Sequence, residues 1–479
     1  MPRTYYERLS LEAASFLERE GSRTFAHSAV LLVFEPGALA RADGGVDFEA
    51  IRSGIEARLA SVPRARQKLR WIPFENHPIW VDDPDFNLEY HLRHTSLPRP
   101  GGEEQLRRMV ARIHAQRLDR SRPLWECWVL EGLEGGRFAM LWKTHHCMVD
   151  PSSEGDLIEA LLSAEPDPPE PRPRGYKPRP LPSAFELVRD EVVRQARVPR
   201  RALERTRATL CRAGWRHDLE LRARGVAKLL GYSIRPRSDH PLAGPTGPHR
   251  RFARGVVPLA ALQAVHRALD APLHDVLLAA LAGAVRTFFL ERLVNPATVD
   301  FRVSAPVTLD RESGDAREET VGEWIVEMPI WERDPRERVA RIRAQTERLH
   351  AASPALGART LVSLAAWTGS RRLSLGAQAV SQRLPVDLAV VNLPGPQTPL
   401  YFRGARLVEG FGIAPLRADH ALSVAILSYD GRLCWALNAD FDRLPDLDRF
   451  AAALAGSLDE LRRAAQSPPS LSVVQNAGG

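Results

Sequence analysis

The chain has 479 residues, about three times the length of a typical domain, so its length predicts two domains of roughly 200 residues and a linker. Hydrophobic residues make up 44% and charged residues 26%, with 32 Gly and 38 Pro, which excludes collagen-like, wholly disordered and coiled-coil proteins. The 66 Lys and Arg residues outnumber the 59 Asp and Glu residues, giving a net charge of +7.

The first part of the chain alternates strand and helix patterns. Apolar runs predict strands, and apolar residues at helical spacing predict helices. The glycines at Glu134-Gly135-Gly136 predict a hairpin between the last two strands. The expected strands are residues 29–34, 69–74, 79–81, 124–130 and 137–144, and the expected helices are 48–59 and 103–116.

Two adjacent histidines follow the last of these strands, in the segment WKTHHCMVDPSSEGDLIEALL. Side chains alternate along a strand, so His145 and His146 face opposite sides and are poor ligands for one metal. A neutral imidazole, with a pKa near ~6.5, suits a general base, and Asp150 lies close enough in sequence to brace the following loop. A lone histidine is more often a structural core residue, but this pair with an aspartate favours a functional His146.

A proline-rich segment separates the two parts of the chain. Eight prolines between Pro166 and Pro182 predict an extended connector, because proline fixes φ and lacks an amide donor. We therefore expect a first half at 1–165, a linker with Arg-rich helices at 166–245 and a second half at 246–479.

The excess positive charge lies in residues 171–240, where 18 basic residues face 7 acidic ones. Residues 183–230 have the spacing of two or three helices, with an apolar stripe that begins at Phe185, Val188 and Val192. Such a stripe normally packs on the protein's own core, and this is the favoured interpretation. Docking onto a membrane surface is the alternative. The excess charge itself could hold nucleic acid, anionic lipid or a phosphorylated ligand, or could form a solvated helical face, which is the favoured interpretation. Nucleic acid is the weakest of the four, because there is no reader motif.

The second half again mixes helices, strands and hairpins, which predicts an α+β fold rather than a doubly wound parallel sheet. The expected strands are residues 254–257, 300–308, 324–330, 386–392 and 401–408, with a hairpin over 421–438 that turns at Asp430-Gly431. The expected helices are residues 259–269, 274–290, 336–350, 358–383 and 447–465.

Several classes of protein are disfavoured by missing features. The longest apolar helical run, 276–285, is shorter than the ~20 residues that span a bilayer, and the charged N-terminal stretch does not resemble a secretory signal. We therefore expect a cytoplasmic protein with reduced cysteines, since no C-x-x-C pair is present. The chain has no G-x-S-x-G, Walker loop, G-x-G-x-x-G after a strand or H-E-x-x-H, which disfavours serine hydrolases, P-loop proteins, dinucleotide enzymes and zincin proteases.

The sequence resembles the bacterial wax ester synthase/diacylglycerol acyltransferase family, part of the CoA-dependent acyltransferases with an H-H-x-x-x-D-G motif. The similarity spans nearly the whole chain in the family's order. The segments that carry it are LSLEAASFL (9–17), VLLVFEPG (30–37), WVDDPDFNLEYHL (80–92), LDRSRPLWECWVLEGLEGGRFAM (118–140), HHCMVDP (145–151), HDVLLAALAGAVR (274–286), RVSAPVTLD (302–310), VVNLPGPQTPLYFRGARL (390–407) and SYDGRLCWALNADFDRLPDLD (428–448).

The resemblance implies two chloramphenicol-acetyltransferase-like domains with an active-site tunnel between them. It implies that His146 is the base that deprotonates an alcohol, whose oxygen attacks the thioester of a long-chain acyl-CoA, and that His145 and Asp150 hold the base and its loop. The residues implied to lie near the substrates are Pro123, Leu124, Trp125, His274, Asp275, Asn392, Pro394 and Gly395.

The implied substrates are acyl-CoA and either diacylglycerol or a fatty alcohol, with no metal and no bound cofactor. The basic segment suggests peripheral contact with an anionic membrane, on its inner face, or with a lipid droplet. Cys147 invites an acyl-enzyme hypothesis, but strand alternation turns it away from His146, so we expect a small buried residue.

The chain departs from the family at three positions. Asp150-Pro151 stands where the family has Asp-Gly, His274 replaces the usual Asn, and Glu12 stands where Asp is common. If the loop requires φ > 0 at Pro151, the site is impaired, whereas Asp150 as N-cap with Pro151 as first helical residue is a favourable helix start, the interpretation preferred here. Two alternatives therefore remain beside the acyltransferase: an enzyme of the same fold with another hydroxyl acceptor, and a non-catalytic lipid-binding homologue.

Overall fold

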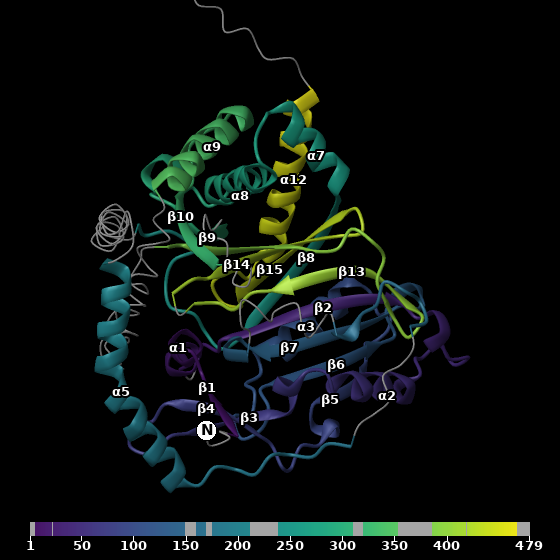
Figure 1. The fold of residues 1–479 in the computed structure, drawn as a ribbon. Helices are drawn as coiled ribbons and strands as arrows, with labels where there is room; N and C mark the ends of the chain where they lie inside the picture. The colour runs from purple at the N-terminus through teal and green to yellow at the C-terminus, as the bar shows by residue number, and fades with distance from the viewer. Residues whose placement is uncertain are drawn as a thin grey trace, which may run out of the picture.

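The computed structural model describes residues 5–21, 23–148, 160–168, 175–210, 238–309, 320–352, 386–417 and 419–466, and the structural statements below refer to these. Two six-stranded sheets lie one above the other, with helices on the outer side of the upper one (Figure 1). A small three-stranded sheet lies at the bottom of this view, and one long helix runs along the edge. The α+β fold class predicted from the sequence is confirmed.

The first sheet has the strand order β12-β13-β2-β7-β6-β5. Its strands are β2 (His27–Glu35), β5 (Leu92–Ser96), β6 (Trp125–Glu131), β7 (Phe138–His145), β12 (Tyr401–Phe402) and β13 (Ala405–Ile413). Alternate residues of β2 enter different cores: Leu32 and Phe34 pack with residues of α2 (Phe48–Leu59), whereas Leu31 and Val33 pack with residues of α3 (Glu103–Ala115). The two helices therefore cover opposite faces of this sheet.

Strands β12 and β13 come from residues that the sequence division assigned to the second half. β13 pairs antiparallel with β2, from Arg406 opposite Glu35 to Ile413 opposite Ala29. The boundaries of the three predicted units stay a prediction, but the first sheet is completed by a strand from the distant end of the chain.

The second sheet has the strand order β10-β9-β11-β14-β15-β8. Its strands are β8 (Arg250–Pro258), β9 (Arg302–Leu309), β10 (Thr320–Glu327), β11 (Leu388–Pro394), β14 (Leu422–Tyr429) and β15 (Arg432–Asp440). Its helices are α7 (Leu259–Ala268), α8 (Leu273–Leu290), α9 (Pro335–Ala352) and α12 (Leu447–Gln466). Buried residues of these helices and strands form one large core, which stabilises this half.

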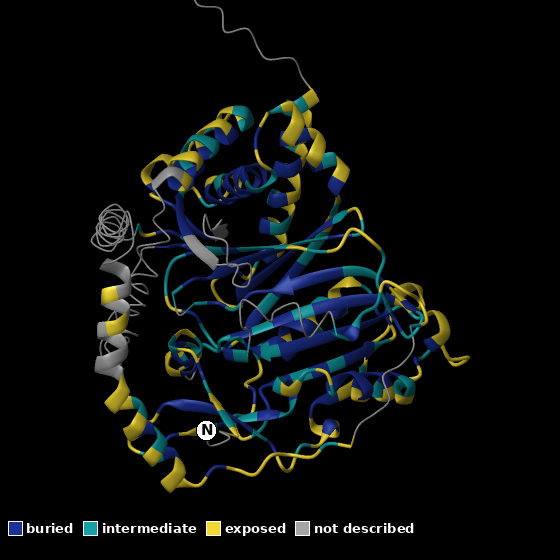
Figure 2. Ribbon diagram, viewed as in Figure 1, coloured by how far each residue is buried: buried dark blue, intermediate teal, exposed yellow. Residues whose placement is uncertain are grey.

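Helix α8 is the apolar centre of the second half. It is long and apolar enough to cross a membrane by length and composition, which the sequence reading had not expected, but 72% of it is buried in the protein. Figure 2 shows it as a dark blue helix between more exposed ones. Its apolar character is therefore explained by packing against the second sheet and the neighbouring helices.

The two halves share a third core. Phe252 and Cys434 of the second sheet pack with Leu31 and Phe411 of the first sheet and with Val110 of α3. Ion pairs reinforce this contact, since the Arg254 guanidinium lies 2.7 Å from both Glu103 and Glu409.

Several short elements complete the fold. They are α1 (Leu11–Arg19), the sheet β1-β4-β3 formed by β1 (Tyr6–Arg8), β3 (Gln67–Trp71) and β4 (Pro78–Asp82), and the short helices η1 (Gly37–Leu39), η2 (Pro63–Arg66), η3 (Leu88–Tyr90), η4 (Glu134–Gly136), η5 (His146–Met148) and η6 (Pro296–Thr298). Helix α1 packs against η5, which carries His146.

The long helix α5 (Ala184–Leu210) corrects one prediction. Its apolar stripe was expected to pack on the core, but Phe185 is 76% and Val192 62% exposed. The helix instead docks through the buried Leu187 and through charge pairs, with Glu191 2.6 Å from Arg8. The face of α5 that carries Leu187 and Glu191 therefore contacts the rest of the protein, and Phe185 and Val192 of the apolar stripe are exposed to solvent.

Most predicted elements lie within a few residues of the observed ones. The hairpin turn at Asp430-Gly431 has φ of 43° and 71°, the conformation that an Asp-Gly turn favours. The predicted strand 401–408 is split, because Arg403 and Gly404 adopt φ of 49° and 80° and form a turn. The predicted strand 324–330 ends at Glu327, the strands β1 and β5 were not predicted, and the predicted helix 358–383 lies outside the described residues.

Candidate active site

The site forms where β7 ends and the chain turns into η5. His145 is the last residue of β7 and His146 the first of η5. The His145 amide donates to Leu124 O at 2.9 Å, and the His146 amide donates to Ala26 O at 2.7 Å. Backbone hydrogen bonds to two neighbouring segments therefore fix both residues at the turn.

The His146 ring lies between β2 and α1. Its Nδ1 is 2.8 Å from Ser28 Oγ, and the Phe16 ring meets it edge to face, with centroids 4.4 Å apart. Burial, together with the charges of His145, Arg19 and Arg417, lowers the pKa of His146 to about 4. The residue is still partly exposed, so His146 is a neutral, accessible imidazole at neutral pH.

The His145 ring has a different environment. It is 1% exposed, its Nε2 lies 3.0 Å from Glu20 Oε1, and its Nδ1 accepts the Cys147 amide at 3.0 Å. An Nδ1 that accepts a hydrogen bond leaves the ring proton on Nε2, directed at Glu20. The two rings therefore have separate partners, as the alternation along β7 predicts.

Glu20 is the carboxylate that organises the His145 side. Its Oε2 lies 2.7 Å from the Arg120 guanidinium, and its Oε1 accepts the Ala26 amide at 3.0 Å. Burial raises the pKa of Glu20, but the contacts with His145, Arg120 and the Ala26 amide outweigh burial and lower it to about 2. Glu20 is thus ionised at any physiological pH.

More buried titratable groups lie on the α3 side of the sheet. Burial lowers the pKa of His27 and His114 well below the usual value, helped by the charge of Lys143. Lys143 is fully buried, donates to Ile113 O at 3.0 Å near the end of α3, and has a pKa lowered by burial to about 8. These groups face α3, whereas the His146 ring lies beside Ser28 and Phe16.

Cys147 occupies the position expected of a structural residue. It is buried beside Leu17 and Leu124, and burial raises the pKa of its thiol far above neutral pH. A thiol that stays protonated is a poor nucleophile. Asp150 and Pro151 lie outside the described residues, so their predicted roles stay predictions.

Pro123, Leu124 and Trp125 are all buried around the start of β6. Trp125 donates from Nε1 to Ala65 O at 2.7 Å and stacks between His91 and Trp142, with ring centroids 4.7 and 4.8 Å away. Leu124 is connected to the site through its carbonyl, which accepts the His145 amide. These three residues are thus buried next to His145, and their contact with an acyl chain stays a prediction.

The pair His274-Asp275 begins helix α8. Asp275 is buried and accepts a hydrogen bond from Thr346 Oγ1 of α9 at 3.0 Å. Burial raises the pKa of Asp275 and lowers that of His274. This pair therefore interacts with α9, through Thr346 and through the charge of His350.

The Asn-x-Pro-Gly-Pro element spans the end of β11. Asn392 and Pro394 lie opposite Ile426 and Ser428 of β14. A Cβ on Gly395 would lie 2.3 Å from Ser428 O, so this position needs glycine. The structure therefore explains the glycine by strand packing, and substrate contact at Asn392, Pro394 or Gly395 stays a prediction.

Sequence reasoning missed four residues around the histidines: Phe16, Glu20, Ser28 and Arg417. Ser28 lies 118 positions from His146, and the two meet because β2 pairs with β7 in the register that sets Ser28 opposite Thr144. The segment 9–17, which contains Phe16, was singled out only by the family resemblance. A single sequence carries no signal for the register of β2 against β7.

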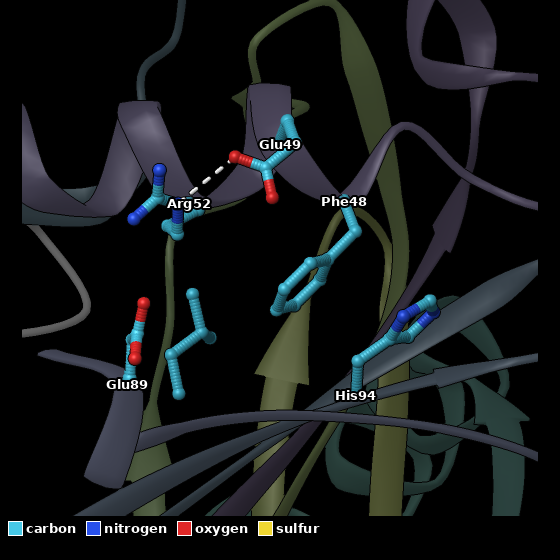
Figure 3. A pocket seen from close by; sticks show the side chains of 6 residues that line it. Phe48, Glu49, Arg52, Glu89 and His94 are labelled. Carbon is cyan, nitrogen blue, oxygen red and sulfur yellow. Dashed lines mark hydrogen bonds and ion pairs between the residues drawn. The ribbon is translucent and has the colours of Figure 1, made fainter.

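A surface cavity of about 310 Å³ lies away from this site, between α2, η3 and β5. In Figure 3 the Phe48 ring and His94 line one side and Arg52 pairs with Glu49 on the other. None of the predicted site residues lines it. The tunnel expected between the halves stays a prediction.

Metal binding has no visible basis in the described part of the chain, where no group of three or more His, Cys, Asp or Glu side chains could hold an ion.

Comparisons with known proteins show the family and the fold of this chain. A family model described as the wax ester synthase/diacylglycerol acyltransferase catalytic domain matches residues 9–277, and the family's C-terminal domain matches residues 320–462. The probable diacylglycerol O-acyltransferase tgs1 of Mycobacterium tuberculosis is 33% identical over 441 residues, which cover 89% of this chain and 90% of the relative. The probable diacylglycerol O-acyltransferase tgs2 of the same organism is 28% identical, over 80% of this chain and 84% of the relative.

Solved structures show the same fold. The wax ester synthase/diacylglycerol acyltransferase from Marinobacter aquaeolei VT8 superposes with a TM-score of 0.66 at 24% identity, covering 96% of this chain and all of that one. The first condensation domain of the CDA synthetase gives 0.57 at 16% identity, covering 97% of both chains. From its sequence matches over both halves, this chain belongs to the wax ester synthase/diacylglycerol acyltransferase family.

Proposed function

We propose that this protein is an O-acyltransferase that moves a long-chain acyl group from acyl-CoA to diacylglycerol or a fatty alcohol, with His146 as general base. Family membership and the names of the relatives support the reaction class. The observation that carries the role of His146 is its environment: a partly exposed residue with a lowered pKa, next to a fully buried and paired His145.

The proposed reaction has two steps. The His146 imidazole takes the hydroxyl proton of the acceptor while the acceptor oxygen attacks the thioester carbonyl. The resulting tetrahedral oxyanion then collapses, the C–S bond breaks, and the imidazolium returns the proton to the CoA sulfur. Acyl transfer of this kind needs a base and positioning, and in this proposal no metal or organic cofactor takes part.

Release of free CoA tests this function directly. Purified protein is incubated with palmitoyl-CoA and a panel containing a diacylglycerol, a fatty alcohol and short hydroxyl compounds, and the thiol is followed with a chromogenic reagent. We expect acceptor-dependent thiol release, and chromatography should identify triacylglycerol or wax ester. No release with any acceptor would support the non-catalytic alternative, whereas release with only non-lipid hydroxyls would support a different acceptor.

We also propose that the enzyme meets its lipid substrates at an anionic membrane surface through the outer face of α5. Phe185 and Val192 lie opposite the face that docks through Leu187 and Glu191, and Arg189 and Arg197 lie beside them in exposed positions. A basic helix with exposed apolar side chains suits the boundary between headgroups and acyl chains.

Vesicle flotation tests this second proposal. The protein should float with vesicles of phosphatidylglycerol and phosphatidylcholine, less so as salt rises, and little with phosphatidylcholine alone. Phe185→Ser with Val192→Ser should reduce flotation several-fold. Leu293→Ser is the matched control, because Leu293 is 96% exposed on another part of the molecule. Equal flotation of the double variant and the wild type would exclude this face.

A further inference from the structure

We propose that Ser28 is a positioning residue: its hydroxyl oxygen accepts the Nδ1 proton of His146 and so keeps Nε2 unprotonated, as a base requires. This inference rests on the proposed role of His146. Ser28 belongs to β2, and nothing in the sequence connects it with the histidine motif.

Two parts of the chain, the segment around the start of β2 and helix α1, hold the His146 ring. Ser28 Oγ lies 2.8 Å from His146 Nδ1, within the range of a strong hydrogen bond. The His146 amide donates to the carbonyl of Ala26, which directly precedes β2 and is only two residues from Ser28. Phe16 of α1 packs edge-on against the ring. The imidazole is thus held in one orientation, with Nδ1 occupied and Nε2 left for a substrate.

The direction of this hydrogen bond decides whether the ring can act as a base. A neutral imidazole carries one proton and one lone pair on its two nitrogens. If Ser28 donated to Nδ1, the proton would lie on Nε2, and the nitrogen available to the acceptor alcohol could not take another. If Ser28 accepts from Nδ1, the Nε2 lone pair is free.

The same contact gains strength during the reaction. When His146 takes up a proton, the ring becomes an imidazolium and the Nδ1–H···Oγ hydrogen bond becomes charge-assisted. Burial disfavours the charged ring, as the lowered pKa of His146 shows. An oxygen acceptor at Nδ1 offsets part of that cost at the stage where the proton is on the ring.

His145 offers the internal contrast. Its Nδ1 accepts the Cys147 amide and its Nε2 faces Glu20, so the opposite tautomer is fixed and neither nitrogen is available to a substrate. Two neighbouring residues of β2 contact the two adjacent rings: the His27 ring meets the His145 ring edge to face, and Ser28 hydrogen-bonds to His146.

Kinetics provide the first test. Ser28→Ala should lower kcat about 10- to 100-fold, the loss expected for one hydrogen bond to a charged group, with KM nearly unchanged. The acid limb of the kcat/KM profile should move to lower pH, because the imidazolium loses its acceptor. Ser28→Thr keeps the hydroxyl on a strand-compatible residue and should restore most of kcat. Ser61→Ala, which removes a hydroxyl that donates to Arg58 O at 2.7 Å, is the matched control and should retain full activity.

The second test does not depend on activity. Long-range nitrogen–proton spectra of protein labelled with ¹⁵N-histidine distinguish the two tautomers, and the His146 signals are those missing from His146→Gln. We expect the Nδ1–H form in the wild type at pH 7.5 and a shift towards Nε2–H in Ser28→Ala. An Nε2–H form in the wild type, or the same tautomer in both proteins, would overturn the inference. If His146→Ala stays active, the base proposal fails, while these spectra still report on Ser28.

Discussion

Two adjacent histidines at the end of β7 have opposite environments. His145 is 1% exposed and engages Glu20 and the Cys147 amide through its two ring nitrogens. His146 remains partly exposed, and its Nδ1 hydrogen-bonds to the hydroxyl of Ser28. The residue type is the same, so the difference in role comes from the elements that surround each ring.

The comparison teaches that two adjacent residues at the end of one strand can have different roles, because their side chains face opposite sides. A buried histidine with both nitrogens engaged holds the turn and cannot exchange protons with a substrate. His146, on the other face, is neutral because burial lowers its pKa, and we propose that it keeps one nitrogen for the reaction. In the proposed mechanism, one histidine of the pair therefore holds the turn and the other acts as the base.

The largest expected effect comes from removing the base. His146→Ala should lower kcat by about 10²- to 10⁴-fold, the usual contribution of a general base, without changing the free energy of unfolding by more than a small amount. Steady-state thiol release and urea denaturation measure the two quantities on the same preparations.

A matched control is His94→Ala. His94 is an exposed histidine that stacks on Phe48 at the surface cavity, so its removal should leave kcat unchanged. A folded His146→Ala variant that keeps most of its activity would remove His146 from the mechanism and end the contrast between the two rings.

Removing the partner of His145 should affect stability more than chemistry. Glu20→Ala leaves His145 and Arg120 without their carboxylate, and breaking a buried pair costs about 3–5 kcal/mol. We expect the urea midpoint to fall accordingly. Glu49→Ala is the control, because Glu49 is 73% exposed in its pair with Arg52 and should cost less than about 1 kcal/mol. Equal losses in the two variants would show that Glu20 does not organise the turn.

The buried histidines predict how stability depends on pH. Burial lowers the pKa of His27 and His114 in the folded protein, so below pH ~6.5 the unfolded chain binds protons that the folded one does not. Stability should therefore fall as the pH drops below ~6.5, by up to about 1.4 kcal/mol per pH unit for each histidine. The stabilising contribution of Glu20, whose pKa is lowered to about 2, is lost only as the pH falls below ~4.5.

Urea denaturation between pH 7.5 and 5 measures this dependence. His27→Gln should make the slope between pH 6.5 and 5 shallower, because one titrating group is gone. A slope that is unchanged in this variant would show that His27 is not a source of the acid sensitivity.

Much of the fold could be predicted from periodicity. Helix α2 was predicted at its observed bounds, because Ile51, Ile55 and Leu59 repeat at helical spacing and each is buried. The Asp430-Gly431 hairpin was equally clear, because its turn chemistry is local. The crossing of β13 into the first sheet could not be predicted, since an apolar strand fits either sheet equally well.

The site was predictable only in part. The alternation of His145 and His146 is a local property of a strand, and the structure gives the two rings separate partners. Ser28 and Glu20 depend on the register of β2 against β7 and on the packing of α1, which no local pattern encodes. The outward stripe of α5 was misassigned because helical spacing does not distinguish a face that packs from a face that is left exposed.

The smallest expected effect concerns Cys147, the residue after the two histidines. Its replacement tests whether Cys147 is a structural residue, like His145. Its thiol is buried beside Leu17 and Leu124, and its raised pKa keeps it protonated, so a covalent acyl-enzyme at this position is disfavoured. Cys147→Ala should keep nearly full kcat and cost about 1 kcal/mol, the effect of a methyl-sized cavity. Thiol release and urea denaturation measure both. The contrary result has two parts: a loss of activity comparable to that of His146→Ala, and an acyl group that stays on the wild-type protein after gel filtration in denaturant. Together they would show that the Cys147 thiol is a nucleophile.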